Sequence, residues 1–365
     1  MVSKHNANLK HAQCFAEILL HADKLYEKGG HHLEHGLLLF DENAKNIEIG
    51  QAWAVRQAGQ DERAASLASE YPERGAHCLY LRQKPTERIT WLNSALKVAH
   101  LRGFEMVEGT LHGKIALALT EMEEYQKAIE HYSIQLKIAE KWKDYEVLGE
   151  GICNLGILYD DLNMLDQARE CYQSALDLAN KISNQKIVEL AMGNLGLVYL
   201  KQDQFTKAVK CFERHLQLAQ KNGDRWSESN ALTNKGIASL KLQNYEQALE
   251  CFQDSILINR KLSDFVGEAK NSSYIGNVLA AIGNLDGAAS AYQARIAIAQ
   301  KLNDLHGEAI GFWNLGEILI RKKNYKLGLT YLQKCVNYEK NHGDPAWEDD
   351  QRALQRVESL SNTEE

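Results

Sequence analysis

The sequence repeats with a period of 40 residues, and three kinds of position carry the repeat. One position holds a small residue, the second an alanine or glycine, and the third an aromatic residue. In chain order these positions are Ala116, Gly156, Gly196, Gly236, Gly276 and Gly316; Ala128, Ala168, Ala208, Ala248, Ala288 and Gly328; and Tyr132, Tyr172, Phe212, Phe252, Tyr292 and Leu332. Such a period is typical of one supersecondary unit stacked into an array. The repeat therefore predicts an extended surface that binds a partner.

Each repeat is predicted to fold as a pair of helices. In residues 145–184, apolar residues recur at helical spacing from Leu148 to Tyr159, and again from Ala168 to Ala179 after a short turn at Asn163. We expect the aromatic residue of the second helix to fill the space toward the next unit. Glycine costs about 1 kcal/mol of helix stability relative to alanine, so its return in five units indicates close packing that a side chain would block.

Bulk composition favours a folded protein outside membranes. Of the 365 residues, 44% are hydrophobic and 25% are charged, which is ordinary for a soluble domain. A net charge of −7 argues against a nucleic-acid or anionic-membrane partner. The chain has no apolar run of the roughly 18 residues that span a bilayer, and the polar stretch from Met1 to Lys10 does not resemble a signal peptide. We therefore expect a cytoplasmic protein.

The sequence predicts no catalytic residue, no metal and no cofactor. It contains no phosphate-binding loop G-x-x-x-x-G-K-[ST], no G-x-S-x-G turn and no C-x-x-C pair. The periodic cysteines Cys171, Cys211 and Cys251 are predicted to be buried thiols that act as small apolar residues. His31 and His35 would share a helix face, but no third ligand is identifiable, so we interpret them as part of a solvated cluster.

The repeat resembles the tetratricopeptide repeat in its longer, 40-residue form. The resemblance rests on motifs of the form Asn194-Leu195-Gly196-x-x-Tyr199, followed by Phe205-x-x-Ala208-x-x-x-Phe212. It implies an all-α fold: a right-handed α-solenoid of about seven helix pairs, with a divergent helical N-terminal segment and a C-terminal capping helix. The expected divisions are a helical N-terminal segment at 1–60, a divergent helix pair at 61–104, six repeat units at 105–344, and a capping helix and tail at 345–365.

A second resemblance covers the region before the regular repeats. The segment Leu38–Trp53, with Tyr71-Pro72 and Arg88–Leu92 after it, is similar to a segment of bacterial signal-transduction NTPases of the STAND class. In those proteins the segment lies between the NTPase core and a repeat sensor. Since no phosphate-binding loop occurs here, the resemblance implies a sensor region without the NTPase.

The resemblance also implies a binding groove lined by the first helix of each unit. The position two residues before the repeat glycine points into that groove; it is occupied by Lys114, Asn154, Asn194, Asn234, Tyr274 and Asn314. A carboxamide offers both a donor and an acceptor, so an asparagine ladder can bond the backbone of an extended peptide. The alternative is that these asparagines bond neighbouring helices and stabilise the array.

Other groove candidates would add specificity. They are Cys153, Ile157, Leu197, Thr233, Ile237, Asn277 and Trp313. Leu197 and Ile237 would give an apolar floor, and Trp313 is either an aromatic anchor or a filler of the last gap between units. The acidic Asp160 and Asp161 give way along the chain to basic residues at Lys201, Lys241, Lys270 and Arg321. These basic residues would select an acidic ligand segment, unless they belong to a solvated face.

Three hypotheses for function remain open at this stage. The first is a non-enzymatic module that binds a protein or peptide as a sensor or scaffold in bacterial signalling. The second is a regulator similar to peptide-controlled response-regulator phosphatases, with its activity in residues 1–60. The third is a structural homo-oligomer whose groove is filled by a neighbouring copy.

Overall fold

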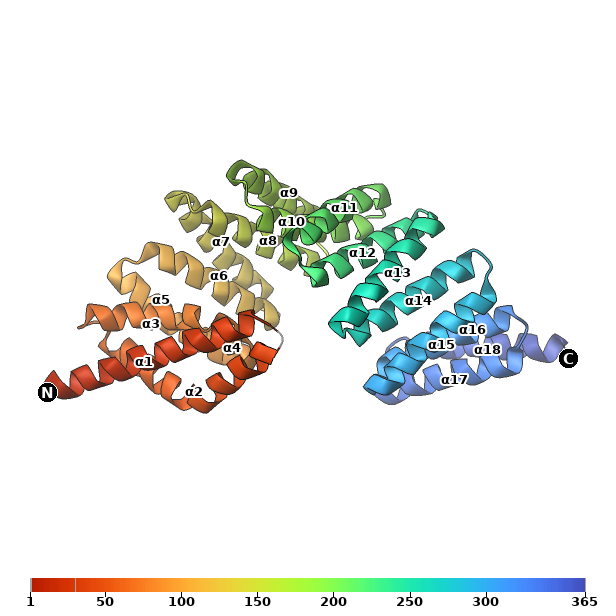
Figure 1. Cartoon of the computed structure of the whole chain (residues 1–365), viewed down its shortest axis with the longest axis horizontal. Helices are drawn as coiled ribbons and strands as arrows, with labels where there is room; N and C mark the ends of the chain where they lie inside the picture. Colours follow the sequence, from red (N-terminus) through yellow and green to blue (C-terminus); the bar gives the residue numbers. More distant parts are fainter. Residues whose placement is uncertain (1, 30, 365) are drawn as a thin grey trace. The chain divides into compact units, whose positions relative to one another are not determined.

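The chain is helical along its length in a computed structural model that describes residues 2–29 and 31–364. The described residues contain eighteen α-helices and no strand, which confirms the predicted all-α class (Figure 1). They divide into two compact units, unit 1 at Met1–Ile187 and unit 2 at Val188–Glu365. Each unit is described by itself.

Unit 1 begins with five helices that are not regular repeats. These are α1 (Val2–Glu27), α2 (His31–Gln57), α3 (Glu62–Arg74), α4 (Ala76–Arg82) and α5 (Pro85–Arg102). Their buried side chains form one core, in which the Tyr71 hydroxyl donates a hydrogen bond to the Ala12 carbonyl at 2.8 Å. The predicted helical N-terminal segment at 1–60 contains α1 and α2, and α2 is one helix from His31 to Gln57. The predicted domain boundaries remain predictions.

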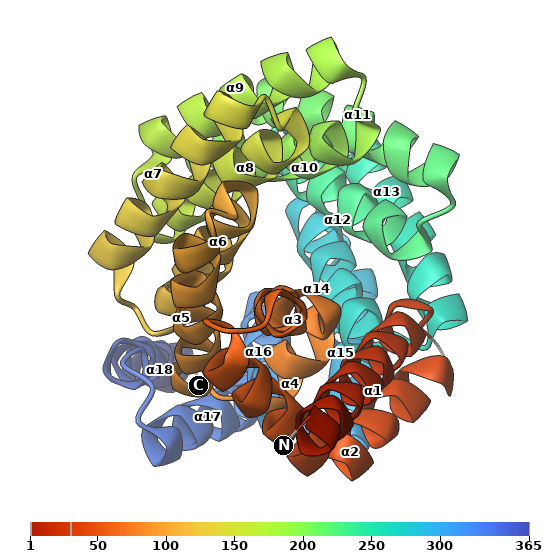
Figure 2. The same cartoon turned by 90° about the vertical axis from the view of Figure 1, so that its left-hand side faces the viewer.

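Regular helix pairs follow. Unit 1 contains α6 (Glu105–Glu121), α7 (Tyr125–Trp142), α8 (Tyr145–Asp161) and α9 (Leu165–Ile182), and α10 (Gln185–Lys201) crosses the boundary between the units. Unit 2 contains α11 (Phe205–Asn222), α12 (Arg225–Lys241), α13 (Tyr245–Leu262), α14 (Phe265–Ala281), α15 (Leu285–Leu302), α16 (Leu305–Arg321), α17 (Tyr325–His342) and α18 (Trp347–Glu364). Pairs such as α14 with α15 and α16 with α17 pack side by side (Figure 1, Figure 2). The bounds of α8 and α9 match the two helices predicted for residues 145–184.

The turns between helices also repeat every 40 residues. Each turn inside a pair has one residue at positive φ, at Glu123, Asn163, Asp203, Gln243, Gly283 and Lys323. A left-handed residue at this position ends a helix and lets the next amide bond back to the last turn. An aspartate then caps several of the following first helices: Asp224 Oδ1 accepts the Ser227 amide at 2.9 Å. The 40-residue period is therefore found in the turns as well as in the core.

The repeat glycines are closely packed, as the sequence predicted, and the group that they pack against is the aromatic register. A Cβ on Gly196 would lie 2.5 Å from the Phe212 ring, and one on Gly236 would lie 2.6 Å from Phe252. Both contacts are closer than a real side chain tolerates, so a side chain at either position would force the ring to move. The ring thus packs first against its own unit, whereas we expected it to face the next unit; Tyr132 also shares a core with Leu155 of the following helix pair.

Unit 2 ends in the predicted capping helix. The sequence placed this helix after Pro345, and α18 begins at Trp347 and packs on α17. Leu354 of α18 is fully buried against Leu332 and Val336 of α17. No described helix is both long and apolar enough to cross a membrane.

Candidate functional site

The predicted ladder positions all lie on first helices, where their side chains are half-buried. They occur on α6, α8, α10, α12, α14 and α16 in turn. Among the described residues, no hydrogen bond engages the carboxamides of Asn154, Asn194, Asn234 or Asn314. Tyr274 differs, because its ring stacks on Phe252 with centroids 5.1 Å apart and packs with the core of that pair.

The other predicted groove residues are divided between core and surface. Ile237 packs against the core that contains Phe252, and Leu197 is half-buried. The basic side chains predicted to select an acidic ligand are exposed, at Lys201, Lys241, Lys270 and Arg321. Arg321 lines a pocket, which we call the C-terminal pocket.

The C-terminal pocket lies within unit 2 and has a volume of about 540 Å³. It brings together four residues that the sequence singled out, Asn277, Trp313, Asn314 and Arg321. Its other lining residues are Ala280, Ala281, Tyr292, Glu317, Ile318, Ile320, Leu332, Ala353 and Val357. Because these residues come from α14, α15, α16, α17 and α18, the capping helix forms one wall.

Several polar groups of this pocket, though not the Asn314 carboxamide, are held by hydrogen bonds to their neighbours. The Tyr292 hydroxyl donates to Asn277 Oδ1 at 2.6 Å, and Arg321 Nη2 donates to the Ala280 carbonyl at 3.0 Å. Burial raises the pKa of Glu317, while a hydrogen bond from Trp313 lowers it in part. Trp313 also packs against the core of α17 and α18. It therefore packs between α16 and the last two helices and also lines the pocket. Its role as an aromatic anchor for a ligand stays a prediction.

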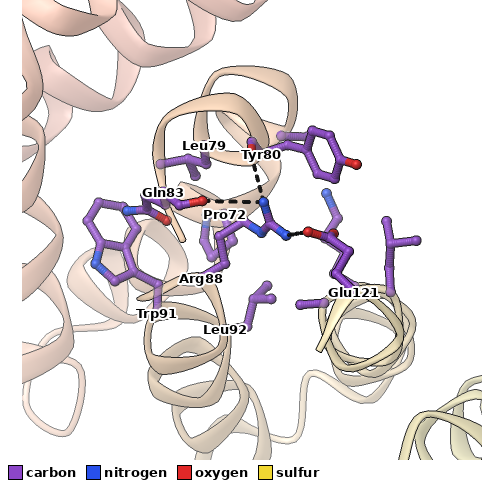
Figure 3. Close-up of a pocket in the computed structure, with 12 residues that line it drawn as sticks. Pro72, Leu79, Tyr80, Gln83, Arg88, Trp91, Leu92 and Glu121 are labelled. Atoms are coloured by element: carbon purple, nitrogen blue, oxygen red, sulfur yellow. Dashed lines mark hydrogen bonds and ion pairs between the residues drawn. The ribbon is translucent and has the colours of Figure 1, made fainter. Parts of the chain in front are cut away.

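Unit 1 contains a smaller pocket, which we call the N-terminal pocket, with a volume of about 110 Å³ (Figure 3). Lys114 lies in its lining and forms an ion pair with Glu73 at 3.0 Å. Arg88 Nη1 donates to the Tyr80 carbonyl at 2.7 Å, and its other terminal nitrogen pairs with Glu121. The ion pair between Arg88 and Glu121 thus forms part of the wall of this pocket.

Sequence reasoning missed a buried polar position in the second helices. Three residues after each packing aromatic stand Gln135, Ala175, His215, Ser255, Arg295 and Cys335. Most of these polar side chains are buried, and Arg295 Nε donates to the Gly307 carbonyl at 3.0 Å. The 40-residue period itself could have revealed the position, because polar types recur there beside a buried ring.

The predicted solvated histidine cluster at residues 31–35 lies partly outside the described side chains. The side chain of His31 lies outside the described residues, and His35 is exposed. Asp23, Glu27 and His77 converge in unit 1. There Asp23 Oδ1 accepts the backbone amides of His77 and Cys78 and thereby caps α4, so the cluster has a structural role.

The described residues define an all-helical repeat protein with a pocket beside its last helices. Its repeats are tetratricopeptide repeats: descriptions of that family match residues 107–181, 188–261 and 311–342. No curated protein matches the chain.

Several solved structures share the fold. A STAND protein with a tetratricopeptide repeat sensor, from Pyrococcus horikoshii, is 14% identical over 96% of this chain, with a TM-score of 0.57. This chain spans 63% of that protein's length. Aspartyl phosphate phosphatase F from Bacillus subtilis is 11% identical over 96% of this chain and 94% of its own, with a TM-score of 0.54. The apo form of RapI is 15% identical over 72% and 94%, with a TM-score of 0.53. At these identities the likeness concerns the fold.

Proposed function

We propose that the chain is a non-enzymatic protein that binds an extended polypeptide segment and acts as a sensor or scaffold in bacterial signalling. One observation carries the proposal: the C-terminal pocket gathers Trp313, Asn314 and Arg321 around one open volume. A pocket of this size with an apolar wall and a few convergent polar groups suits a ligand of several residues.

The asparagine positions support an extended ligand. Asn234 and Asn314 lie in unit 2 with carboxamides that no described neighbour engages. Each carboxamide can donate to a peptide carbonyl and accept from a peptide amide. Recognition through the backbone gives affinity without sequence preference, so specificity would come from the pocket.

A peptide display library tests this proposal. The full chain is immobilised, and bound peptides are compared with those bound by Trp313→Ala and Asn314→Ala variants. We expect peptide enrichment to be at least tenfold lower with each variant than with the native chain, with the helicity measured by circular dichroism unchanged. Asn337→Ala changes an exposed asparagine on the second helix α17 and serves as the control. Equal enrichment by all variants, or none by the native chain, would refute the proposed site.

The second candidate is a regulator similar to the phosphatases of response regulators. It is favoured by the fold likeness to aspartyl phosphate phosphatase F, which extends over 96% of this chain. Cutting the chain near residue 60 would not test it cleanly, because α1 and α2 share a core with α3 that includes Tyr71. Phosphate release from phosphorylated receiver domains, measured with the full chain, is the direct test. Accelerated release would favour this candidate over a pure binding role.

A structural homo-oligomer is the third candidate. Light scattering across a concentration series measures the mass of the particle. A constant monomer mass would remove this candidate and leave the groove available for other partners.

A further inference from the structure

Three potential metal ligands converge where α17 meets the capping helix. Cys335 and Glu339 lie one turn apart on α17, and Asp350 lies on α18. One donor atom from each lies within 4.8 Å of the others. The Cys335 thiol is 2% exposed and donates to Glu339 Oε1 at 3.3 Å.

The glutamate stands where the array otherwise places a small buried residue. The equivalent positions of the earlier units hold Ala139, Ala179, Ala219, Asn259 and Ala299, all of them buried. Glu339 Oε2 is itself buried and meets no hydrogen-bond donor among the described residues. Burying a carboxylate oxygen without a partner is costly. The last unit therefore has a carboxyl group where four of the five earlier units have a methyl group.

No basic side chain compensates this cluster in the described part of the chain. Lys340 lies over the Trp347 ring at 5.5 Å, and Arg352 pairs with Asp349. Two carboxyl groups that face each other away from bases need a shared proton or a cation between them.

We propose that Cys335, Glu339 and Asp350 bind one divalent cation of the borderline class that includes Zn²⁺. A thiolate with two carboxylates is a donor set that such ions accept, and water would complete a tetrahedral shell. Binding converts the Cys335 thiol into a thiolate, and its proton passes to solvent. The ion would join α17 to α18 and so fix the wall of the C-terminal pocket. The site stands on its own geometry and is independent of any peptide ligand.

Cobalt(II) is the probe, because a cobalt–thiolate bond absorbs in the near ultraviolet. We expect one equivalent of Co²⁺ to produce this charge-transfer absorption in the full chain, with release of a proton, and Zn²⁺ to displace the Co²⁺. The Cys335→Ala variant should lose the absorption, and Asp350→Asn should bind Co²⁺ at least tenfold more weakly. Cys251→Ala removes an equally buried thiol elsewhere in unit 2 and should leave the absorption intact.

Two results would overturn the proposal. The first is the absence of absorption in the native chain, and the second is its persistence in Cys335→Ala with unchanged helicity. In either case a proton alone occupies the space between the carboxyl groups. Zn²⁺ would then leave the melting temperatures of the native chain and of Asp350→Asn unchanged. A metal site instead predicts that Zn²⁺ raises the melting temperature of the native chain more than that of Asp350→Asn.

Discussion

The two pockets share one position of the repeat but differ in what lies opposite it. Lys114 and Asn314 occupy the same register, five periods apart, and each lines a pocket in its own unit. In unit 1, Arg88 of α5 reaches across to Glu121, and the remaining volume is about 110 Å³. In unit 2, the capping helix presents Ala353 and other small or medium side chains, and the volume is about 540 Å³.

This difference shows what a periodic sequence determines. The period sets the direction in which a first-helix side chain points, because every unit has the same helix pair. The neighbour outside the period sets what that side chain meets. We therefore expect a ligand site at the C-terminal end of the array, where small side chains of α18 lie opposite the ladder position. At the N-terminal end, where the pair of Arg88 and Glu121 lies opposite that position, we expect a closed wall.

The largest expected effect distinguishes the arginines of the two pockets. Arg88 is 8% exposed and its pair with Glu121 lies in the N-terminal pocket wall, whereas Arg321 is exposed. We expect Arg88→Ala to lower the free energy of unfolding by about 2 to 3 kcal/mol, since it removes packing and leaves a partly buried carboxylate unpaired. Arg321→Ala should change it by less than about 0.5 kcal/mol. Urea denaturation followed by circular dichroism gives both values, and equal losses would contradict the comparison.

The next effect concerns the repeat glycine, which unit 1 replaces by Ala116 in its first pair. Gly236→Ala would drive a Cβ to 2.6 Å from the Phe252 ring. The clash should outweigh the gain in helix propensity and cost about 1 to 2 kcal/mol. The reverse change, Ala116→Gly, should cost about 1 kcal/mol from propensity alone. A Gly236→Ala variant more stable than the native chain would show that the ring can move aside.

The sequence predicted the helix pairs and the close packing of the repeat glycines because those features depend on local spacing. Leu148 to Tyr159 and the turn at Asn163 are sufficient to locate α8 and α9. It did not predict the buried polar position, because residues such as Arg295 ordinarily indicate an exposed face. Arg295 is buried only since the Gly307 carbonyl of the next unit accepts its hydrogen bond.

The candidate site was predicted in part. Trp313 and Asn314 were identified by counting from the glycine and Arg321 by the change from acidic to basic residues along the chain, and all three line one pocket. The wall formed by Ala353 and Val357 was not predicted, because the docking of α18 lies outside the period. Tyr274 turned toward Phe252 instead, since an aromatic ring gains more from stacking than from exposure.

Acid should lower the stability of unit 1 through a pair of histidine rings that unit 2 lacks at the equivalent positions. His112 and His131 of unit 1 have Nδ1 atoms 2.8 Å apart, and Phe312 with Tyr331 occupies the same register in unit 2. Burial lowers the pKa of His112 to about 4 and also lowers that of His131. The unfolded chain therefore binds more protons below pH 6.5, and stability falls as the pH drops from about 6.5 toward 4.

We expect this loss to be about 1 kcal/mol at pH 5, after allowance for partial exposure of the rings. A double variant, His112→Phe with His131→Tyr, gives unit 1 the ring pair of unit 2 and should remove most of the acid sensitivity. Urea midpoints measured at several pH values test this expectation. An unchanged pH profile in the double variant would mean that other groups carry the acid response.

The smallest effect on stability is expected at the wall of the C-terminal pocket. A substitution there can change peptide capture without changing the free energy of unfolding. Ala353→Leu extends a side chain into open volume, so the free energy of unfolding should change by less than about 0.5 kcal/mol. Peptide capture should nevertheless fall, because the isobutyl side chain of leucine, which replaces a methyl group, occupies space in the pocket that Trp313 also lines. Gln355→Leu adds the same group to an exposed position of α18 and should leave capture unchanged. Equal capture by both variants would mean that the ligand does not enter this pocket, and a large loss of stability in Ala353→Leu would mean that the wall is packed as tightly as its counterpart in unit 1.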